Sequence, residues 1–238
     1  MTQSNGWQVY TGPSDIDGRP IRAVMTGTRT PSKNSKTGPQ RQLFILPDSG
    51  ESPSQAVKSG NDESVCGTCK RRPFLVAQAL EQATTKKERA AVPKPCYVRV
   101  FQSVNAVGRT SYPTTYEGPA PTTSLRLGAW AEPTALPYET VAALVGPTGH
   151  TGYTHRWREC DQRFREILMA SVDTLEERRE ARALGWRCFR TRKSHEAVQR
   201  GEIVCPASKE AGQRTTCDQC KLCAGASHKA KDVVIIEH

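Results

Sequence analysis

The chain has 238 residues, nine cysteines and a formal net charge of +10. This length allows one large domain or two small ones, and it can bury a core without disulfides. Residues 1–12 lack the apolar stretch of a secretory signal, and no run approaches the eighteen apolar residues of a membrane span. We therefore expect a cytoplasmic protein without a membrane partner, in which the cysteines serve as metal ligands because disulfides are rare there.

The first part of the chain, residues 1–65, is expected to be a polar segment that contains strands. Short strands are predicted at 21–26 and 42–46, with a polar loop between them. Lys33 and Lys36 in that loop are candidates for contact with an anion or a nucleic acid. The loop lacks the spacing of a phosphate-binding P-loop.

Residues 66–238 are expected to form an α/β metal-binding domain, either separate from the first segment or continuous with it. A helix is predicted over 74–90, ended by Pro93 and Pro95, and a strand over 96–101. Between Cys66 and Arg109 there are nine Lys or Arg against two Glu. This excess of positive charge favours an anionic partner such as nucleic acid, although a solvated basic loop is an equal alternative. The candidate residues of this patch are Lys70, Arg71 and Arg72.

From residue 125 onward, strand patterns alternate with helical patterns. The strands are predicted at 125–130, 151–155, 169–172, 186–190, 203–205 and 233–237, and the helices begin at Pro137, Asp161 and Asp173. Such alternation predicts parallel βαβ units. The expected fold class is α/β, a partial or distorted (β/α) barrel with cysteine-rich metal-binding loops. A doubly wound open sheet is the main alternative.

Polar or reactive residues follow these predicted strands, at the edge where active sites of such folds gather. They are Glu132, His155, Asp173, Arg190, Cys205 and His238. His155 is a candidate for acid–base catalysis, with a hydrogen-bonded structural role as the alternative. Asp173 is a candidate for binding a ribose hydroxyl, or for capping the next helix.

Seven cysteines fall into two candidate metal sites. Cys205, Cys217, Cys220 and Cys223, here called the four-thiol set, have the C-x2-C-x2-C run that favours a 4Fe–4S cluster over zinc. Cys66, Cys69 and Cys96, here called the three-thiol set, have the ligands for a 4Fe–4S cluster with one open iron. Zinc with a fourth ligand such as His, or a redox pair at 66 and 69, are the alternatives. The remaining two cysteines, at 160 and 188, are expected to be core thiols.

Several motifs from about residue 25 onward resemble those of an uncharacterised cysteine-rich protein family of bacteriophages and mobile elements. They are the 32–38 loop, Cys66-Gly67-x-Cys69, Cys96-Tyr97-Val98, Leu125-Arg126-Leu127-Gly128-Ala129, Gly152-Tyr153-Thr154-His155, Gly185-Trp186-Arg187 and the four-thiol set with Pro206-Ala207-Ser208. This resemblance implies the cytoplasm of an infected host as the location. It implies no reaction.

The run from Gly128 to Pro133 is similar to the Gly-Gly-Glu-Pro strand end of radical S-adenosylmethionine enzymes. The similarity implies a partial barrel and a reactive 4Fe–4S cluster on the three-thiol set, with the four-thiol set holding an auxiliary cluster. It further implies that Gly128, Glu132 and Asp173 bind the cofactor S-adenosylmethionine. The chain departs from those enzymes in its cysteine spacing, since they place their three cysteines on one C-x3-C-x2-C loop.

The function expected from these features is that of an iron–sulfur metalloprotein of radical type, acting on a nucleic acid or a nucleotide-like substrate. In that enzyme His155, Glu132 and Asp173 would take part in catalysis. A non-catalytic zinc protein that binds nucleic acid is the first alternative. An inhibitor of a host protein is the second.

Overall fold

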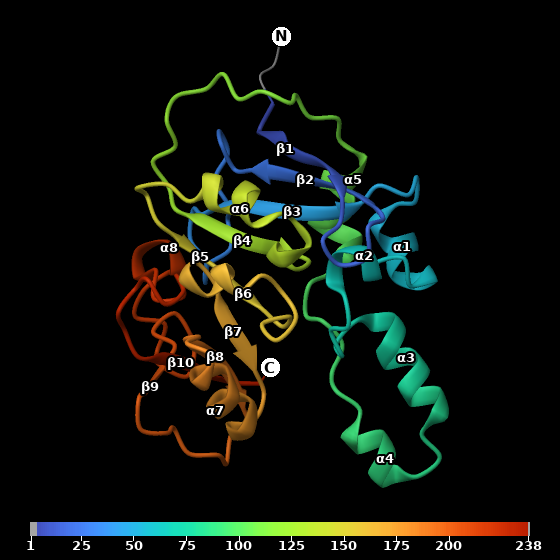
Figure 1. Cartoon of the computed structure of the whole chain (residues 1–238), viewed down its shortest axis with the longest axis vertical. Helices are drawn as coiled ribbons and strands as arrows, with labels where there is room; N and C mark the ends of the chain where they lie inside the picture. The colour runs from blue at the N-terminus through green and yellow to red at the C-terminus, as the bar shows by residue number, and fades with distance from the viewer. Residues whose placement is uncertain (1–3, 238) are drawn as a thin grey trace.

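The computed structural model describes residues 4–237 as a mixed α/β fold with two five-stranded sheets (Figure 1). Sheet A contains, in spatial order, β1 (Gly6–Pro13), β2 (Pro20–Thr26), β3 (Arg41–Pro47), β4 (Leu125–Trp130) and β5 (His150–Thr151). Sheet B contains β6 (Tyr153–Thr154), β7 (Met169–Val172), β8 (Cys188–Arg192), β10 (Asp232–Ile236) and β9 (Glu202–Val204). No helix within the described residues is long and apolar enough to cross a membrane.

Sheet A is mixed. β1, β2 and β3 pair antiparallel, whereas β3, β4 and β5 pair parallel. Its outer edge is covered, because the backbone N–H of Gln8 donates to the carbonyl of Pro113 and Trp7 stacks on Tyr116 with ring centroids 4.5 Å apart. Strands from before and after residue 65 therefore share one sheet.

Sheet B is parallel throughout. Helix α7 (Leu175–Ala183) packs against β7 and β8. The helix starts at a capping box, in which the hydroxyl of Thr174 accepts from the backbone N–H of Glu177 at 3.1 Å. β10 lies between β8 and β9, so two strands that are close in the sequence are separated by one that follows both.

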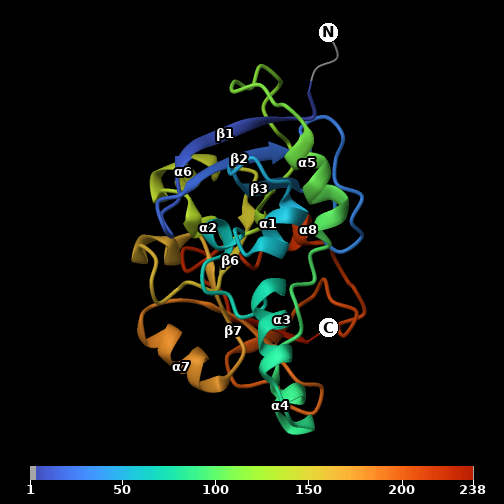
Figure 2. The same ribbon diagram turned by 90° about the vertical axis from the view of Figure 1, so that its right-hand side faces the viewer.

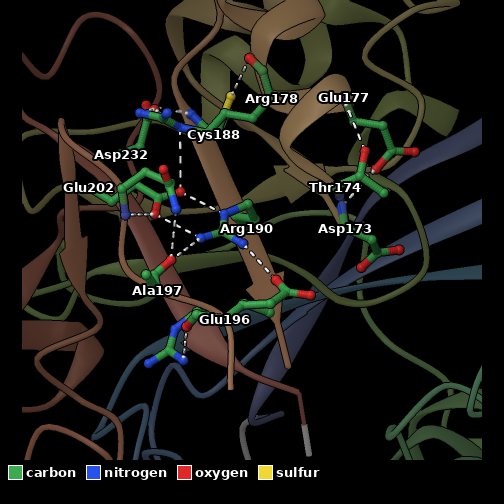
Figure 3. A network of polar contacts seen from close by, with 12 residues as sticks. Asp173, Thr174, Glu177, Arg178, Cys188, Arg190, Glu196, Ala197, Glu202 and Asp232 are labelled. Atoms are coloured by element: carbon green, nitrogen blue, oxygen red, sulfur yellow. Dashed lines mark hydrogen bonds and ion pairs between the residues drawn. The ribbon is translucent and has the colours of Figure 1, made fainter. Parts of the chain in front are cut away.

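The centre of sheet B is held by a buried network of charged side chains (Figure 3). Arg190 in β8 and Glu202 in β9 are bonded twice, at 2.7 and 2.9 Å, and Arg190 is 1% exposed. Asp232 in β10 is fully buried and accepts from Arg178 at 2.8 Å and from the backbone N–H of Cys188 at 3.0 Å. Each carboxylate is thus compensated by a guanidinium, as burial requires.

The two sheets meet at one glycine. Only Gly152 separates β5 from β6, and β5 pairs with β4 while β6 pairs with β7. A Cβ at this position would lie 2.6 Å from Cδ2 of Leu168 and 2.9 Å from Cβ of Leu127, so a larger residue does not fit. Leu127 and Leu168 belong to the same buried cluster, which makes the core of the two sheets continuous.

The remaining helices are α1 (Pro53–Ser59), α2 (Glu63–Cys66), α3 (Pro73–Gln82), α4 (Lys86–Ala91), α5 (Asn105–Arg109), α6 (Tyr138–Leu144) and α8 (Cys217–Cys220). Figures 1 and 2 show α3 and α4 as an arm that extends away from sheet A, whereas α1 and α2 lie close to it. The four-residue helix α8 lies beside β5.

Several sequence predictions of secondary structure differ from the structure. The single helix expected over 74–90 is two helices, because Thr85 forms a capping box with Glu88 and starts α4 afresh. The strand expected over 96–101 is a loop that enters a short helical turn, Val100–Val104. Its residues do alternate in exposure, with Tyr97 and Phe101 69% and 66% exposed, but among the described residues no strand pairs with it.

The third difference concerns the strand expected over 186–190, which is β8 at 188–192. Arg190 therefore lies within the strand and in the buried network, not at the strand end as expected. The helix expected from Asp161 is a short 3-10 turn, Gln162–Glu166. His238, expected at a strand end, lies outside the described residues.

Candidate functional site

His155 and Asp173 directly follow β6 and β7, and Glu132 comes two residues after the end of β4, as the strand pattern predicted. The structure brings the first two into contact, because Oε1 of Glu132 lies 2.8 Å from Nδ1 of His155. Asp173 lies near enough for its charge to raise the pKa of His155. The carboxyl ends of parallel strands thus collect three titratable side chains in one place, where α/β folds commonly carry out chemistry.

Glu132 is 5% exposed and fully engaged in hydrogen bonds. Its carboxylate accepts from the hydroxyl of Thr154 at 2.6 Å and from the backbone N–H of His155 at 3.1 Å. Burial raises its pKa, but the bonds with His155 and the histidine's charge outweigh that effect, so the pKa lies below its usual value. Glu132 is therefore ionised although its carboxylate is buried away from solvent.

The backbone before Glu132 is strained. Ala131 has φ +75°, a left-handed conformation that costs a residue with a Cβ about 1 kcal/mol. Gly128 has φ +68°, and a Cβ there would lie 2.8 Å from the carbonyl oxygen of Ala131. Gly128, predicted to bind a cofactor, is thus needed for the turn that positions Glu132. The left-handed backbone of Ala131 lowers the stability of the fold at the same turn.

His155 is held between two strands and is partly open to solvent. Its Nε2 lies 3.2 Å from the hydroxyl of Ser171 in β7, and its side chain is 36% exposed. Burial lowers its pKa, but the bond with Glu132 and the charges of Glu132 and Asp173 raise it more, so the pKa lies above its usual value of 6.5. His155 can thus carry a proton near neutral pH and present it to a neighbouring molecule.

Asp173 is surrounded by positive charge. Its carboxylate lies 2.7 Å from Nζ of Lys70 and 3.2 Å from the guanidinium of Arg71, and it accepts from the hydroxyl of Thr191. Burial raises its pKa, but these contacts lower it to about 2. Arg71 also binds Glu237 at 2.9 Å. These residues line a pocket of about 310 Å³, in which the basic side chains are already paired with carboxylates.

Arg72, predicted to bind an anion together with Lys70 and Arg71, lies elsewhere. Its side chain is 5% exposed and pairs with Asp62 at 2.8 Å, while its guanidinium also donates to the carbonyls of Gly60 and Gly67. Arg72 thus ties the loop around Cys66 and Cys69 to α2. Its guanidinium is not accessible to a macromolecular anion.

The three-thiol set gathers next to Glu132. The backbone N–H of Glu132 donates to the carbonyl of Val65, the residue before Cys66. Burial raises the pKa of Cys66, and the charges of Asp62, Cys69, Cys96 and Glu132 raise it further. The pKa of Cys69 is raised to about 12 by burial and by Glu132. The thiols of the set therefore affect one another, and carboxylates surround them.

Cys96 joins this set across 27 residues of chain. Its backbone N–H donates to the carbonyl of Arg71 at 2.7 Å, which fixes the loop after the α3–α4 arm beside the C-x2-C turn. Burial raises the pKa of Cys96, while Arg71 and Arg126 lower it. The α3–α4 arm thus begins and ends at the three-thiol set, where this bond joins its two ends.

The four-thiol set lies beside β5, where helix α8 packs. Burial raises the pKa of Cys223, and Cys205, Cys217 and Cys220 raise it further. Helix α8 is fixed by backbone bonds from Cys217 to the carbonyl of Lys36 at 2.9 Å and from Gly152 to the carbonyl of Cys223 at 2.8 Å. The four cysteines come from two segments, and Cys205, Cys217 and Cys223 share one small cluster of apolar neighbours.

The polar loop that carries Lys33 and Lys36 packs on this set. The backbone N–H of Asp218 donates to the carbonyl of Thr37 at 3.0 Å, and the charge of Lys36 lowers the pKa of Cys205 and Cys217 against the effect of burial. Lys36, predicted to contact an anion, is thus close to thiols that become anionic on ionisation. Lys33 is exposed.

Within residues 4–237, no three His, Cys, Asp or Glu side chains are grouped so that they could hold a metal ion. The donor chemistry nevertheless fits soft metals, because each set offers several thiols whose ionisation burial and like charge disfavour, and a bound cation would reverse both effects. Cys188 is buried and its thiol lies 3.8 Å from the carbonyl of Arg178, as expected of a core thiol, whereas Cys160 is partly buried.

The sequence analysis missed Ser171, Arg126 and Tyr97. Arg126 donates to the phenol oxygen of Tyr97 at 2.9 Å, and its charge lowers the pKa of both Cys96 and Cys217. The sequence did contain a signal for two of them, because Tyr97 directly follows a candidate ligand and Arg126 lies in a predicted parallel strand.

Comparisons with protein-family models, curated proteins and solved structures gave no match. Functional assignment therefore depends on the geometry of the site.

Proposed function

We propose that this protein is an iron–sulfur enzyme of radical type whose reactive centre forms on the three-thiol set. One observation carries the proposal: Cys66 and Cys69 of one turn and Cys96 of a second segment lie close enough for their charges to interact, near Glu132, whose carboxylate binds His155 at the carboxyl ends of parallel strands. Three thiolates leave one iron of a 4Fe–4S cluster open to a ligand other than cysteine. The cofactor proposed for that position is S-adenosylmethionine.

The topology supports a partial (β/α) barrel as the scaffold. Seven strands, from β3 to β9 in spatial order, run parallel if residues 150–154 are taken as one strand shared by the two sheets. Glu132 follows β4, which is where the similarity to radical S-adenosylmethionine enzymes expects an acidic residue. A carboxylate that is ionised and dry suits an ammonium group.

Each residue of the site then has its own proposed role. Glu132 orients His155, since it binds both the backbone N–H and Nδ1 of that residue. His155 holds a proton at its partly exposed ring, close to Ser171. Asp173 holds Lys70 and Arg71 at the pocket wall through ion pairs. The bound cluster would supply one-electron chemistry.

The four-thiol set is proposed to hold a second, closed metal centre. Four thiolates satisfy either a 4Fe–4S cluster or a structural zinc ion. The set connects the loop at 34–38 with β5 and the end of β9, so a metal bound there would stabilise the packing of these segments.

A second candidate function is a zinc-stabilised nucleic-acid-binding protein. The observation that favours it is the α3–α4 arm, where Lys86, Lys87, Arg89 and Lys94 are exposed. Phosphate contacts by such residues give binding that weakens steeply with salt.

The test is the content of iron, zinc and acid-labile sulfide in protein purified without oxygen, together with its electron paramagnetic resonance spectrum after reduction. The proposal expects iron and sulfide, loss of one signal in Cys66→Ser with Cys69→Ser, and a change in that signal on addition of S-adenosylmethionine. Cys160→Ser is the matched control and should keep both metal centres. Zinc without sulfide would overturn the proposal and favour the second candidate.

A further inference from the structure

A second pocket, of about 530 Å³, lies over one face of sheet A, close to both thiol sets. Its floor is a row of directly paired residues across β2, β3 and β4: Thr26 opposite Gln42, and Gln42 opposite Arg126. One wall is the segment from Tyr97 to Val107, and another belongs to the 27–34 loop. The volume is that of a site for one small organic molecule.

The walls offer aromatic faces. Tyr97 lines the pocket and is 69% exposed, an unusual state for an aromatic side chain of a folded protein, and Phe44 and Tyr112 line the same space. Tyr97 is nevertheless fixed, because Arg126 donates to its phenol oxygen at 2.9 Å. An exposed, oriented ring of this kind is a platform on which a planar base can stack.

The charge of this pocket differs from that of the pocket at Asp173. Arg99 and Arg126 line it, and none of the described residues that line it is an Asp or a Glu. The other pocket has three carboxylates among its lining residues. The guanidiniums of this pocket thus face no competing carboxylate within it, and they can bind the oxygens of a phosphate in the bidentate manner that arginine favours.

Amide side chains complete the lining. Gln42 carries a donor and an acceptor, the combination that hydrogen-bonds the edge of a nucleobase, whereas Oδ1 of Asn34 already accepts from the backbone N–H groups of Lys36 and Thr37, so Asn34 offers its amide donor. The pocket also borders the three-thiol set, since Tyr97 follows Cys96 in the chain and Arg126 lowers the pKa of Cys96. A ligand in this pocket would therefore lie beside the proposed reactive centre.

We propose that this pocket binds a nucleotide, with its base against Tyr97 and its phosphate at Arg99 and Arg126. The nucleotide is either a free molecule or one unit of a single-stranded nucleic acid, because both present the same base and phosphate. This inference rests on the proposed function only where it makes the nucleotide the substrate. Binding itself requires no metal chemistry.

The experiment measures binding by isothermal calorimetry to protein of known metal content. The probes are the adenosine, guanosine, cytidine and uridine 5′-monophosphates and a mixed-sequence single-stranded 10-mer of DNA and of RNA. Tyr97→Ala should weaken binding about tenfold, because one stacked base is lost. Phe101→Ala is the matched control, since Phe101 is equally exposed on the same segment but does not line the pocket. Arg109→Gln is the control for Arg99→Gln, because Arg109 is exposed near the end of the same stretch of chain but does not line the pocket.

The outcomes separate the two sources and the two proposals. Binding of a monophosphate that Tyr97→Ala and Arg99→Gln weaken and both controls leave unchanged supports a free nucleotide. The same pattern for the 10-mers alone supports a strand. No binding of either kind of probe, or binding insensitive to Tyr97→Ala, overturns the inference. Iron and sulfide are measured on the same samples, so nucleotide binding by protein that lacks a cluster would overturn the proposed function while leaving the pocket assignment intact.

Discussion

The two thiol sets differ in the charged side chains around them, although Arg126 lies close to both. Carboxylates of Asp62 and Glu132 raise the pKa of Cys66, whereas Lys36 and Arg126 lower the pKa of Cys217. Burial raises the pKa of both thiols. A cation bound at the three-thiol set therefore gains from the neighbouring carboxylates, while an anionic, fully thiolate-ligated cluster is better compensated at the four-thiol set. This difference suits an open reactive centre at the first and a closed one at the second.

The largest effect is expected from removing ligands of one set at a time. Cys217→Ser with Cys220→Ser should abolish metal binding at the four-thiol set and lower the thermal midpoint by several degrees, because α8 has only four residues and little packing of its own. Metal at the three-thiol set should remain. Metal analysis and calorimetry measure both effects. Equal loss from both sets would mean that the seven cysteines form one site.

The next effect concerns the scaffold of the four-thiol set. Glu202→Ala leaves Arg190 buried without its main partner, and we expect a loss of about 3–5 kcal/mol in the free energy of unfolding. Glu180→Ala is the control, because its bond to Arg158 joins two half-exposed side chains and should contribute less than about 1 kcal/mol. Urea denaturation distinguishes them. Similar losses in the two variants would contradict the role given to the buried network.

A smaller effect is expected at the three-thiol set from Glu132→Gln. Removing the carboxylate charge leaves burial as the main influence on His155, so the pKa of His155 should fall from above 6.5 to below it. Two-dimensional NMR of the histidine ring measures this change. A pKa that stays above 6.5 in the variant would show that Asp173 alone sustains it.

The same variant has a pH signature in stability. The raised pKa of His155 gives stability that is complete below pH 6.5 and is lost as pH rises through the raised value. The lowered pKa of Glu132 gives stability that is complete above pH 4.5 and is lost as pH falls through the lowered value. The cost of Glu132→Gln, about 1–2 kcal/mol, should therefore be greatest between these pH values.

The smallest effect is expected from Lys36→Met. In metal-free protein at pH 8, its loss should slow alkylation of Cys205 and Cys217 roughly twofold, because the ammonium group lowers their pKa values. Lys33→Met is the control on the same loop. Peptide mass spectrometry after timed alkylation gives the rates. An equal effect of the two lysines would point to the net charge of the loop instead of the position of Lys36.

Local pattern predicted the residues that follow strands, but not their partners. The strands at 125–130 and 169–172 were predicted with their true bounds, since buried parallel strands give short apolar runs with clear ends. Glu132 and Asp173 were found in this way. Ser171 was not singled out, because its contact with His155 depends on the register between β6 and β7, which no local pattern contains.

The grouping of cysteines was predictable where spacing determines it and less so elsewhere. The spacing of the three cysteines at 217–223 is enough to predict that they group together. Cys96 lies near Cys66 only because the chain after the α3–α4 arm returns and bonds to the carbonyl of Arg71. The strand expected at 96–101 is wrong for a related reason: its residues alternate in exposure as predicted, but no strand of the described residues pairs with it, and Tyr97 is bound by a distant arginine instead. Hydrogen bonds between residues far apart in the sequence position the side chains of the site, and the periodicity of the sequence does not predict them.

The position of β10 has a consequence for biosynthesis. This strand lies between β8 and β9, although the ribosome makes both of them first. Until residues 232–236 have emerged, β9 has no neighbour in sheet B, and Cys205 at its end has no fixed position relative to α8. The final geometry of the four-thiol set, which we propose binds a metal, is therefore complete only after β10 is made, and the thiols of a shorter nascent chain are open to oxidation.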